Sequence, residues 1–117
     1  YWMRLLIIAI LAIGSAFGML IDRPATSEWV SIADLPREAR QTLVLIKNGG
    51  PFPYSRDGIT FGNFEKQLPA QPRGYYHEYT VKTPWRNDRG PRRIISGQRG
   101  EFYYTDDHYK SFRRIKE

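Results

Sequence analysis

Four side chains in the second half of the chain combine acid–base chemistry with positive charge. Glu78 could accept a proton and His108 could donate one, while Arg89 and Arg93, four residues apart, could hold an anion between them. Taken singly, Glu78 beside His77 reads as an exposed pair on a sheet face, and His108 reads as an ordinary loop histidine. Taken together, the four side chains are the parts needed to cleave a phosphodiester bond without a metal ion.

Arg89 and Arg93 belong to a cluster of five arginines within fourteen residues, which hold one acid, Asp88. The planar guanidinium group fits phosphate oxygens, although a solvated basic edge strand is the alternative interpretation. The cluster consists of Arg86, Arg89, Arg92, Arg93 and Arg99. The whole chain has 117 residues and a formal net charge of +6, which favours polyanions as partners: nucleic acid, anionic lipid or acidic protein.

The chain has no cysteine and two histidines. This composition excludes disulfides, a thiolate nucleophile and a cysteine zinc site, and we expect neither a metal ion nor another cofactor.

Residues 1–24 are expected to be a signal peptide or a membrane anchor. Residues 5–21 carry no charge, and they lie between Arg4 and the charged pair Asp22 and Arg23. The basic start and the small residues 14–16 favour a cleaved secretory signal, while the length also fits a short membrane helix. In either case the remaining domain, residues 25–117, faces the outside, as a secreted protein or as a membrane-anchored one.

The pattern of residues 35–47 predicts a helix. Asp34 is a candidate N-cap, Pro36 suits a first turn, and Gly49 and Gly50 are typical of a helix end. Turn residues then separate short β-branched and aromatic segments, which predict antiparallel strands at residues 75–82, 92–97, 101–105 and 111–115. The predicted fold class is α+β, with one N-terminal helix packed on a twisted antiparallel sheet. In this fold Glu78 lies in the middle of a strand and His108 just beyond a strand end.

Four ordered segments closely resemble the secreted microbial guanyl-specific ribonucleases, the family of barnase and its streptomycete relatives. The segments are residues 50–55 (GPFPYS), 75–81 (YYHEYTV), 89–95 (RGPRRII) and 103–109 (YYTDDHY). The likeness extends from about Trp29 to Ile115, although Ser31 stands where the streptomycete relatives have a disulfide cysteine. The resemblance implies the microbial ribonuclease fold, and we take a monomer as the default oligomeric state.

The resemblance also implies roles for the catalytic residues. Glu78 would be the general base and His108 the general acid, while Arg89, Arg93 and Tyr109 would bind the phosphate. We expect the two arginines to keep Glu78 ionised, and Asp106 or Asp107 to keep His108 protonated.

Residues 61–65 match the guanine-binding loop of the family. Glu65 would accept both donors on the pairing edge of guanine, and Asn63 belongs to the same loop. Phe61 would stack on the base, with a core phenylalanine as the alternative. The sequence departs from the family at Gly62 and at Phe64, which replaces an arginine; Phe64 would either stack on the base or meet a partner.

The function expected from this resemblance is a guanyl-specific endoribonuclease that cleaves single-stranded RNA 3′ to guanosine. The reaction would pass through a 2′,3′-cyclic phosphate and end in a 3′-phosphate, without a metal ion. The alternative is a non-catalytic or weakly active basic module that binds RNA. A small acidic inhibitor of the barstar type is a further expected partner.

Overall fold

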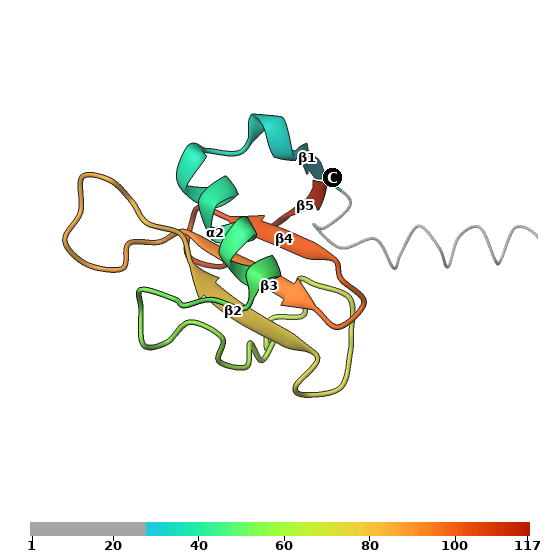
Figure 1. Cartoon of the computed structure of the whole chain (residues 1–117). Coiled ribbons are helices and arrows are strands. Elements are labelled where there is room, and N and C mark those ends of the chain that lie inside the picture. The colour runs from blue at the N-terminus through green and yellow to red at the C-terminus, as the bar shows by residue number, and fades with distance from the viewer. Residues whose placement is uncertain (1–27) are drawn as a thin grey trace, which may run out of the picture.

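A five-stranded sheet carries one α-helix on one of its faces in the computed structural model, which describes residues 28–117 (Figure 1). The predicted signal or anchor, residues 1–24, lies outside the described residues. The elements are β1 (Trp29–Ser31), the short 3-10 helix η2 (Ile32–Asp34), α2 (Arg37–Asn48), β2 (Tyr76–Thr80), β3 (Arg93–Gly97), β4 (Phe102–Thr105) and β5 (Arg113–Lys116).

The strand order in the sheet is β1-β5-β4-β3-β2. Strands β2 to β5 pair with one another in antiparallel fashion, as predicted, and each is shorter than its predicted range. Strand β1 was not predicted, and it runs parallel to β5, with Val30 opposite Ile115. Three residues are too few to show an alternating pattern, so only the pairing with the C-terminal strand reveals β1.

Helix α2 begins two residues later than predicted. Pro36 occupies the N-cap position, and its carbonyl accepts hydrogen bonds from the amides of Ala39 and Arg40. The predicted capping role of Asp34 is wrong: this residue lies in η2, where its carboxylate accepts a hydrogen bond from Ser31. Leu35 is extended because a residue that precedes proline avoids the helical conformation, and this places Asp34 outside the helix.

The helix ends at the predicted glycines. Gly49 is left-handed, with φ 80°, and its amide donates to Ile46, while the amide of Gly50 donates to Leu45. This double hydrogen bond satisfies the last carbonyls of the helix and turns the chain away.

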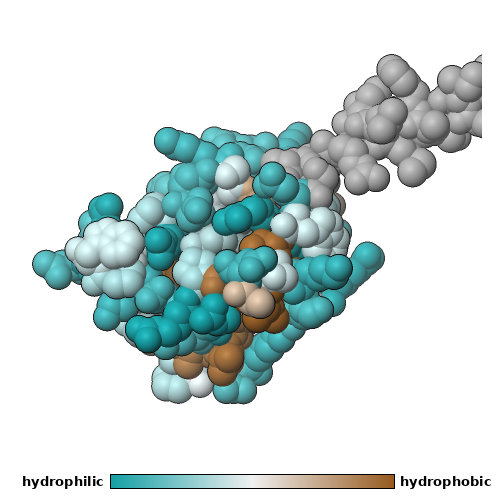
Figure 2. Space-filling view, turned by 90° about the horizontal axis from the view of Figure 1, so that it is seen from above, coloured by the Kyte–Doolittle hydropathy of each residue, from teal (hydrophilic) through white to brown (hydrophobic). Residues whose placement is uncertain are grey.

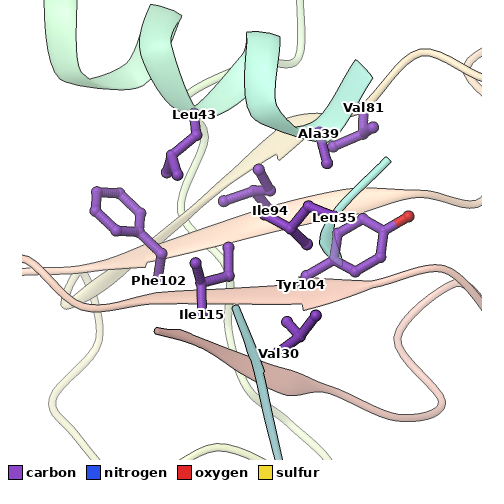
Figure 3. Close-up of a cluster of buried hydrophobic side chains, with 9 residues drawn as sticks. All are labelled: Val30, Leu35, Ala39, Leu43, Val81, Ile94, Phe102, Tyr104 and Ile115. Atoms are coloured by element: carbon purple, nitrogen blue, oxygen red, sulfur yellow. The ribbon is translucent and has the colours of Figure 1, made fainter. Parts of the chain in front are cut away.

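Two apolar clusters lie on opposite faces of the sheet. Figure 3 shows the first cluster between α2 and the sheet, where Leu43 and Ala39 of the helix point toward Ile94 of β3. The second cluster includes Ile95 and Tyr103, the neighbours of Ile94 and Tyr104 in their strands. Alternation of side chains therefore places odd-numbered residues of β3 and β4 on the face that α2 leaves uncovered.

The surface seen from above Figure 1 is mostly hydrophilic, with apolar residues gathered in one area (Figure 2). No helix within residues 28–117 is long and apolar enough to cross a membrane.

Candidate active site

A cavity of about 510 Å³ lies against the second cluster and brings together four segments of the chain. These segments are the loop before β2, strand β2 itself, the loop between β2 and β3, and the loop after β4. The cavity is lined by Arg56, Ile59, Thr60, Phe61, Gly62, Asn63, Phe64, Glu65, Gln67, Glu78, Arg89, His108, Tyr109 and Phe112. Seven of the eight predicted site residues are among them, and the eighth, Arg93, contacts two of the others.

Glu78 lies in the middle of β2, opposite Ile95, as the alternation predicted. Its side chain is buried, with 7% of the residue exposed, so the interpretation as an exposed surface pair is wrong. The hydroxyl of Tyr109 donates a hydrogen bond to Glu78 Oε1, and Arg93 Nε lies 3.9 Å from the same oxygen. A buried carboxylate with a cation and a hydroxyl donor beside it is held in one position at the cavity wall.

The two arginines reach the site from different points. Arg93 is 3% exposed; its Nε donates to the Tyr109 hydroxyl over 3.0 Å, and its Nη1 donates to the carbonyl of Gly90 over 2.8 Å. Arg89 precedes β3, and its Nε and Nη2 donate to Thr80 Oγ1 over 3.1 and 2.9 Å. The edge-strand alternative is wrong for Arg93, since β3 lies between β4 and β2 and the side chain is buried. Both guanidinium groups are therefore held by the protein before any anion binds.

His108 and Tyr109 form the turn that follows β4. Both have left-handed backbones, with φ 58° and 72°. The amide of His108 donates to the carbonyl of Pro91 over 3.0 Å. The ring centroids of His108 and Tyr109 lie 4.8 Å apart. The exposed imidazole borders the main cavity and also a second hollow of about 420 Å³. Arg89 likewise lines both, and Arg86 and Pro91 line the second hollow. A histidine at this junction can exchange protons with a group on either side.

Within residues 28–117, no ion pair joins His108 to Asp106 or Asp107, and the expectation that these acids keep His108 protonated stays a prediction. The carboxylate of Asp106 lies 3.8 Å from Arg113, and that of Asp107 accepts hydrogen bonds from Thr105 and Ser111. Asp106 thus faces a residue of β5, while Asp107 is bound within its own loop.

Tyr109 connects the other groups. Burial raises the pKa of its hydroxyl, and the hydrogen bond to Glu78 raises this pKa further. The hydroxyl therefore keeps its proton near neutral pH and donates it in a hydrogen bond to the carboxylate. The Tyr109 ring stacks on Phe61, with centroids 5.4 Å apart and planes at 25°.

The predicted base-binding loop forms one wall of the cavity. Phe61 lines the cavity and also packs edge-on against Phe112 of the second cluster, so it is partly buried against the core, and its stacking on a base stays a prediction. Glu65 is exposed at the cavity. The side chain of Asn63 closes the loop: its Oδ1 accepts from the amide of Leu68 over 3.1 Å, and its Nδ2 donates to the carbonyl of the same residue over 2.9 Å.

The sequence did not single out Arg56, Thr60 and Gln67 as site residues, although all three line the cavity. Thr60 forms an isolated bridge with His77, which places its loop along the free edge of β2. Their residue types and local spacing carry no signal for this chemistry. In the part of the chain that the structure describes, no group of three or more His, Asp or Glu side chains could hold a metal ion.

Comparisons with known proteins agree on one family. Residues 22–116 match the family model for ribonuclease. Guanyl-specific ribonuclease St of Saccharopolyspora erythraea is 58% identical over 86 residues, which is 74% of this chain and 85% of that protein. Guanyl-specific ribonuclease Sa of Kitasatospora aureofaciens is 55% identical over 89 residues, or 75% of this chain and 93% of that protein.

A solved structure of ribonuclease Sa2, determined in complexes with mononucleotides, superposes with a TM-score of 0.76 at 49% identity. It covers 77% of this chain and 94% of the Sa2 chain. A second Sa2 structure, with guanosine-2′-cyclophosphate, superposes with a TM-score of 0.73 at 48% identity. The match over residues 22–116, the relatives and the shared fold lead to one conclusion: this chain belongs to the ribonuclease family, among the microbial guanyl-specific ribonucleases.

Proposed function

We propose that this ribonuclease cleaves single-stranded RNA on the 3′ side of guanosine by two successive steps at the main cavity. The observation that carries the proposal is the meeting of Glu78, Arg93 and Tyr109 in one contact group, with His108 at the same cavity. Base, cation and acid thus surround one volume large enough for a nucleotide.

In the first step, Glu78 accepts the proton of the ribose 2′-hydroxyl. The 2′-oxygen forms a bond to the adjacent phosphorus, the bond from phosphorus to the 5′-oxygen of the next nucleoside breaks, and His108 gives its proton to that oxygen. The product is a 2′,3′-cyclic phosphate. In the second step, His108 accepts a proton from water, and the water oxygen forms a bond to phosphorus. The bond from phosphorus to the 2′-oxygen breaks, and Glu78 returns its proton to that oxygen, which leaves a 3′-phosphate.

Negative charge gathers on the phosphoryl oxygens in both steps. Arg89 and Arg93 supply positive charge from positions fixed by Thr80, Gly90 and Tyr109, so little reorganisation accompanies the reaction. RNA is required because DNA has no 2′-hydroxyl.

Base choice falls to the loop around Glu65. Its carboxylate can accept the N1–H and N2–H donors of guanine, while Phe61 offers a stacking face at the cavity. Single strands are the expected substrate since a paired guanine already uses these donors.

Two expectations outside the cavity stay with this proposal. Residues 1–24 would direct export of the domain formed by residues 25–117, and the intact mass of the exported protein would distinguish a cleaved signal from an anchor. A small acidic inhibitor would place a carboxylate near Arg89 and Arg93, where the phosphate binds. A purified inhibitor of the barstar type that leaves activity unchanged would exclude that inhibitor as a partner.

The deciding experiment measures cleavage of GpA, ApA, CpA and UpA in EDTA. We expect wild-type protein to cleave GpA fastest, and Glu78→Ala and His108→Ala to lose this activity. Glu38→Ala on the helix and His77→Ala, the other histidine, serve as matched controls that retain it. Equal rates on all four dinucleotides would contradict guanine preference; RNA binding without any cleavage would favour the non-catalytic alternative.

A further inference from the structure

Gln67 joins the predicted base-binding loop, residues 61–65, to the turn of residues 108–110, which we call the catalytic turn. Its side-chain Nε2 donates hydrogen bonds to the carbonyl of Lys110 over 2.7 Å and to the carbonyl of Tyr109 over 3.3 Å. Both partners are acceptors, so only the amide nitrogen can face them. The bridge spans more than forty residues of sequence and ends on the two residues that follow His108.

The catalytic turn needs such support because its backbone is strained. His108 and Tyr109 adopt φ values of 58° and 72° without being glycine, a left-handed conformation in which the Cβ atom lies too close to the following carbonyl oxygen. The three backbone amides of the turn donate to other segments or side chains: His108 to Pro91, Tyr109 to Thr105 Oγ1, and Lys110 to the Asp107 carboxylate. Gln67 supplies the donor for two backbone carbonyls, those of Tyr109 and Lys110.

Gln67 is itself held in place. The Asn63 side chain bonds both the amide and the carbonyl of Leu68, and the amide of Lys66 donates to the Asn63 carbonyl. Leu68, the residue after Gln67, is 1% exposed in the second apolar cluster. The bridge therefore connects the catalytic turn to a closed loop anchored in the core, rather than to a mobile side chain.

We propose that Gln67 is a positioning residue for His108 and Tyr109, a role that rests on the proposed ribonuclease mechanism. Gln67 lies two residues after Glu65, so its place in the sequence alone suggests a part in binding the base. Its hydrogen bonds instead point to the chemical step. Its loss should therefore lower kcat and leave KM for GpA nearly unchanged, because the base contacts stay in place while the imidazole and the Tyr109 hydroxyl lose their fixed positions.

The test compares Gln67→Ala, Gln67→Glu and Gln67→Lys with a matched control, Gln98→Ala. Gln98 also donates from its side-chain amide to a backbone carbonyl, that of Gly74, in a different part of the fold. We expect kcat on GpA to fall about tenfold in Gln67→Ala, with KM and the affinity for 3′-GMP within about twofold of wild type. Gln67→Glu should lose as much, since a carboxylate cannot donate to carbonyls, whereas lysine can donate and should restore most of kcat.

A second readout does not depend on activity. Amide hydrogen exchange of His108, Tyr109 and Lys110 should become faster in Gln67→Ala and stay unchanged in Gln98→Ala. Unchanged kcat and exchange, or a raised KM with unchanged kcat, would overturn the proposal. Inactive wild-type protein would overturn the ribonuclease mechanism instead, and the exchange measurement would then still decide whether Gln67 holds the turn.

Discussion

At the residue scale, Tyr109 makes the largest number of different contacts in the active site. Its hydroxyl donates to Glu78 and accepts from Arg93, and its ring lies between Phe61 and His108. Because burial raises the pKa of this hydroxyl, with Glu78 raising it further, the group is a neutral hydrogen-bond donor near neutral pH. One side chain thus contacts both Glu78 and Arg93 and holds them at a fixed distance.

Removing this hydroxyl in Tyr109→Phe should lower both activity and stability. Glu78 and Arg93 are buried and would each lose a partner, which costs about 1–3 kcal/mol in the free energy of unfolding. We expect kcat/KM on GpA to fall at least about tenfold. Urea unfolding of the same protein measures the loss of stability.

Tyr104→Phe is the matched control for that change. The Tyr104 hydroxyl is buried on the helix face of the sheet and has no hydrogen-bond partner among residues 28–117. Its removal should leave activity unchanged and should not lower the free energy of unfolding. Equal losses in the two variants would show that the contacts of Tyr109 carry no special weight.

Phe64, one of the two expected departures from the family, has an exposed side chain at the cavity. The residue is 84% exposed at the cavity, and its ring lies 2.6 Å from where a Cβ atom on Gly62 would stand. Only glycine at position 62 allows the ring to lie over this part of the loop. The two departures at Gly62 and Phe64 therefore form one structural unit.

Phe64→Ala should raise KM for GpA about tenfold with kcat within about twofold, since stacking of a base on an aromatic ring contributes about 1–3 kcal/mol. Gly62→Ala, which displaces the ring, should have a similar effect. Trp85→Ala removes another exposed aromatic residue, 76% exposed and outside the cavity lining, and should leave KM unchanged. A KM that does not respond to either loop variant would favour a partner-binding role for Phe64.

At the element scale, the loop between β4 and β5 is folded around one carboxylate. Asp107 accepts hydrogen bonds from Thr105 Oγ1, from the amide of Lys110, and from both the amide and the hydroxyl of Ser111. Burial alone would raise the pKa of Asp107, but the hydrogen bonds from Ser111, Thr105 and Lys110 outweigh it, and the pKa is lowered. The ionised form of this group therefore stabilises the loop that carries His108.

This lowered pKa predicts acid sensitivity of a definite sign. The unfolded chain protonates Asp107 near the ordinary aspartate pKa of about 3.9, and the folded chain does so only at lower pH. The stabilisation is therefore complete above that value and is lost as the pH falls through the folded pKa. Urea unfolding should show that wild type is more stable than Asp107→Asn at about pH 6. The difference in the free energy of unfolding between the two proteins should narrow below about pH 4. A gap that stays constant with pH would contradict this account.

At the scale of the whole molecule, the chain that follows the apolar segment has a net positive charge. Without Arg4, Asp22 and Arg23, sixteen basic and eleven acidic residues remain. The field of this excess attracts a polyanion before specific contacts form.

Cleavage of a long single-stranded RNA should therefore depend on salt more strongly than cleavage of GpA. Between about 50 and about 500 mM NaCl, kcat/KM on the long RNA should fall steeply, since each phosphate contact adds to the slope. GpA carries one phosphate and should show a shallower dependence. Parallel salt curves for the two substrates would mean that only the groups in the cavity attract RNA.

Features that depend on neighbouring residues could be predicted from the sequence. The end of α2 at Gly49 and the position of Glu78 within a strand follow from local patterns, because backbone preference and side-chain alternation act over a few residues. The resemblance to the guanyl-specific ribonucleases rested on four short segments, and the matches to the family confirm it.

Contacts between distant groups depend on how the whole sheet and its loops pack. Three examples are the parallel pairing of β1 with β5, the burial of Glu78 beside Tyr109, and the bridge from Gln67 to the turn after β4. No local pattern encodes such contacts, because the energy that selects them comes from burial and hydrogen bonding between segments that are far apart in the chain.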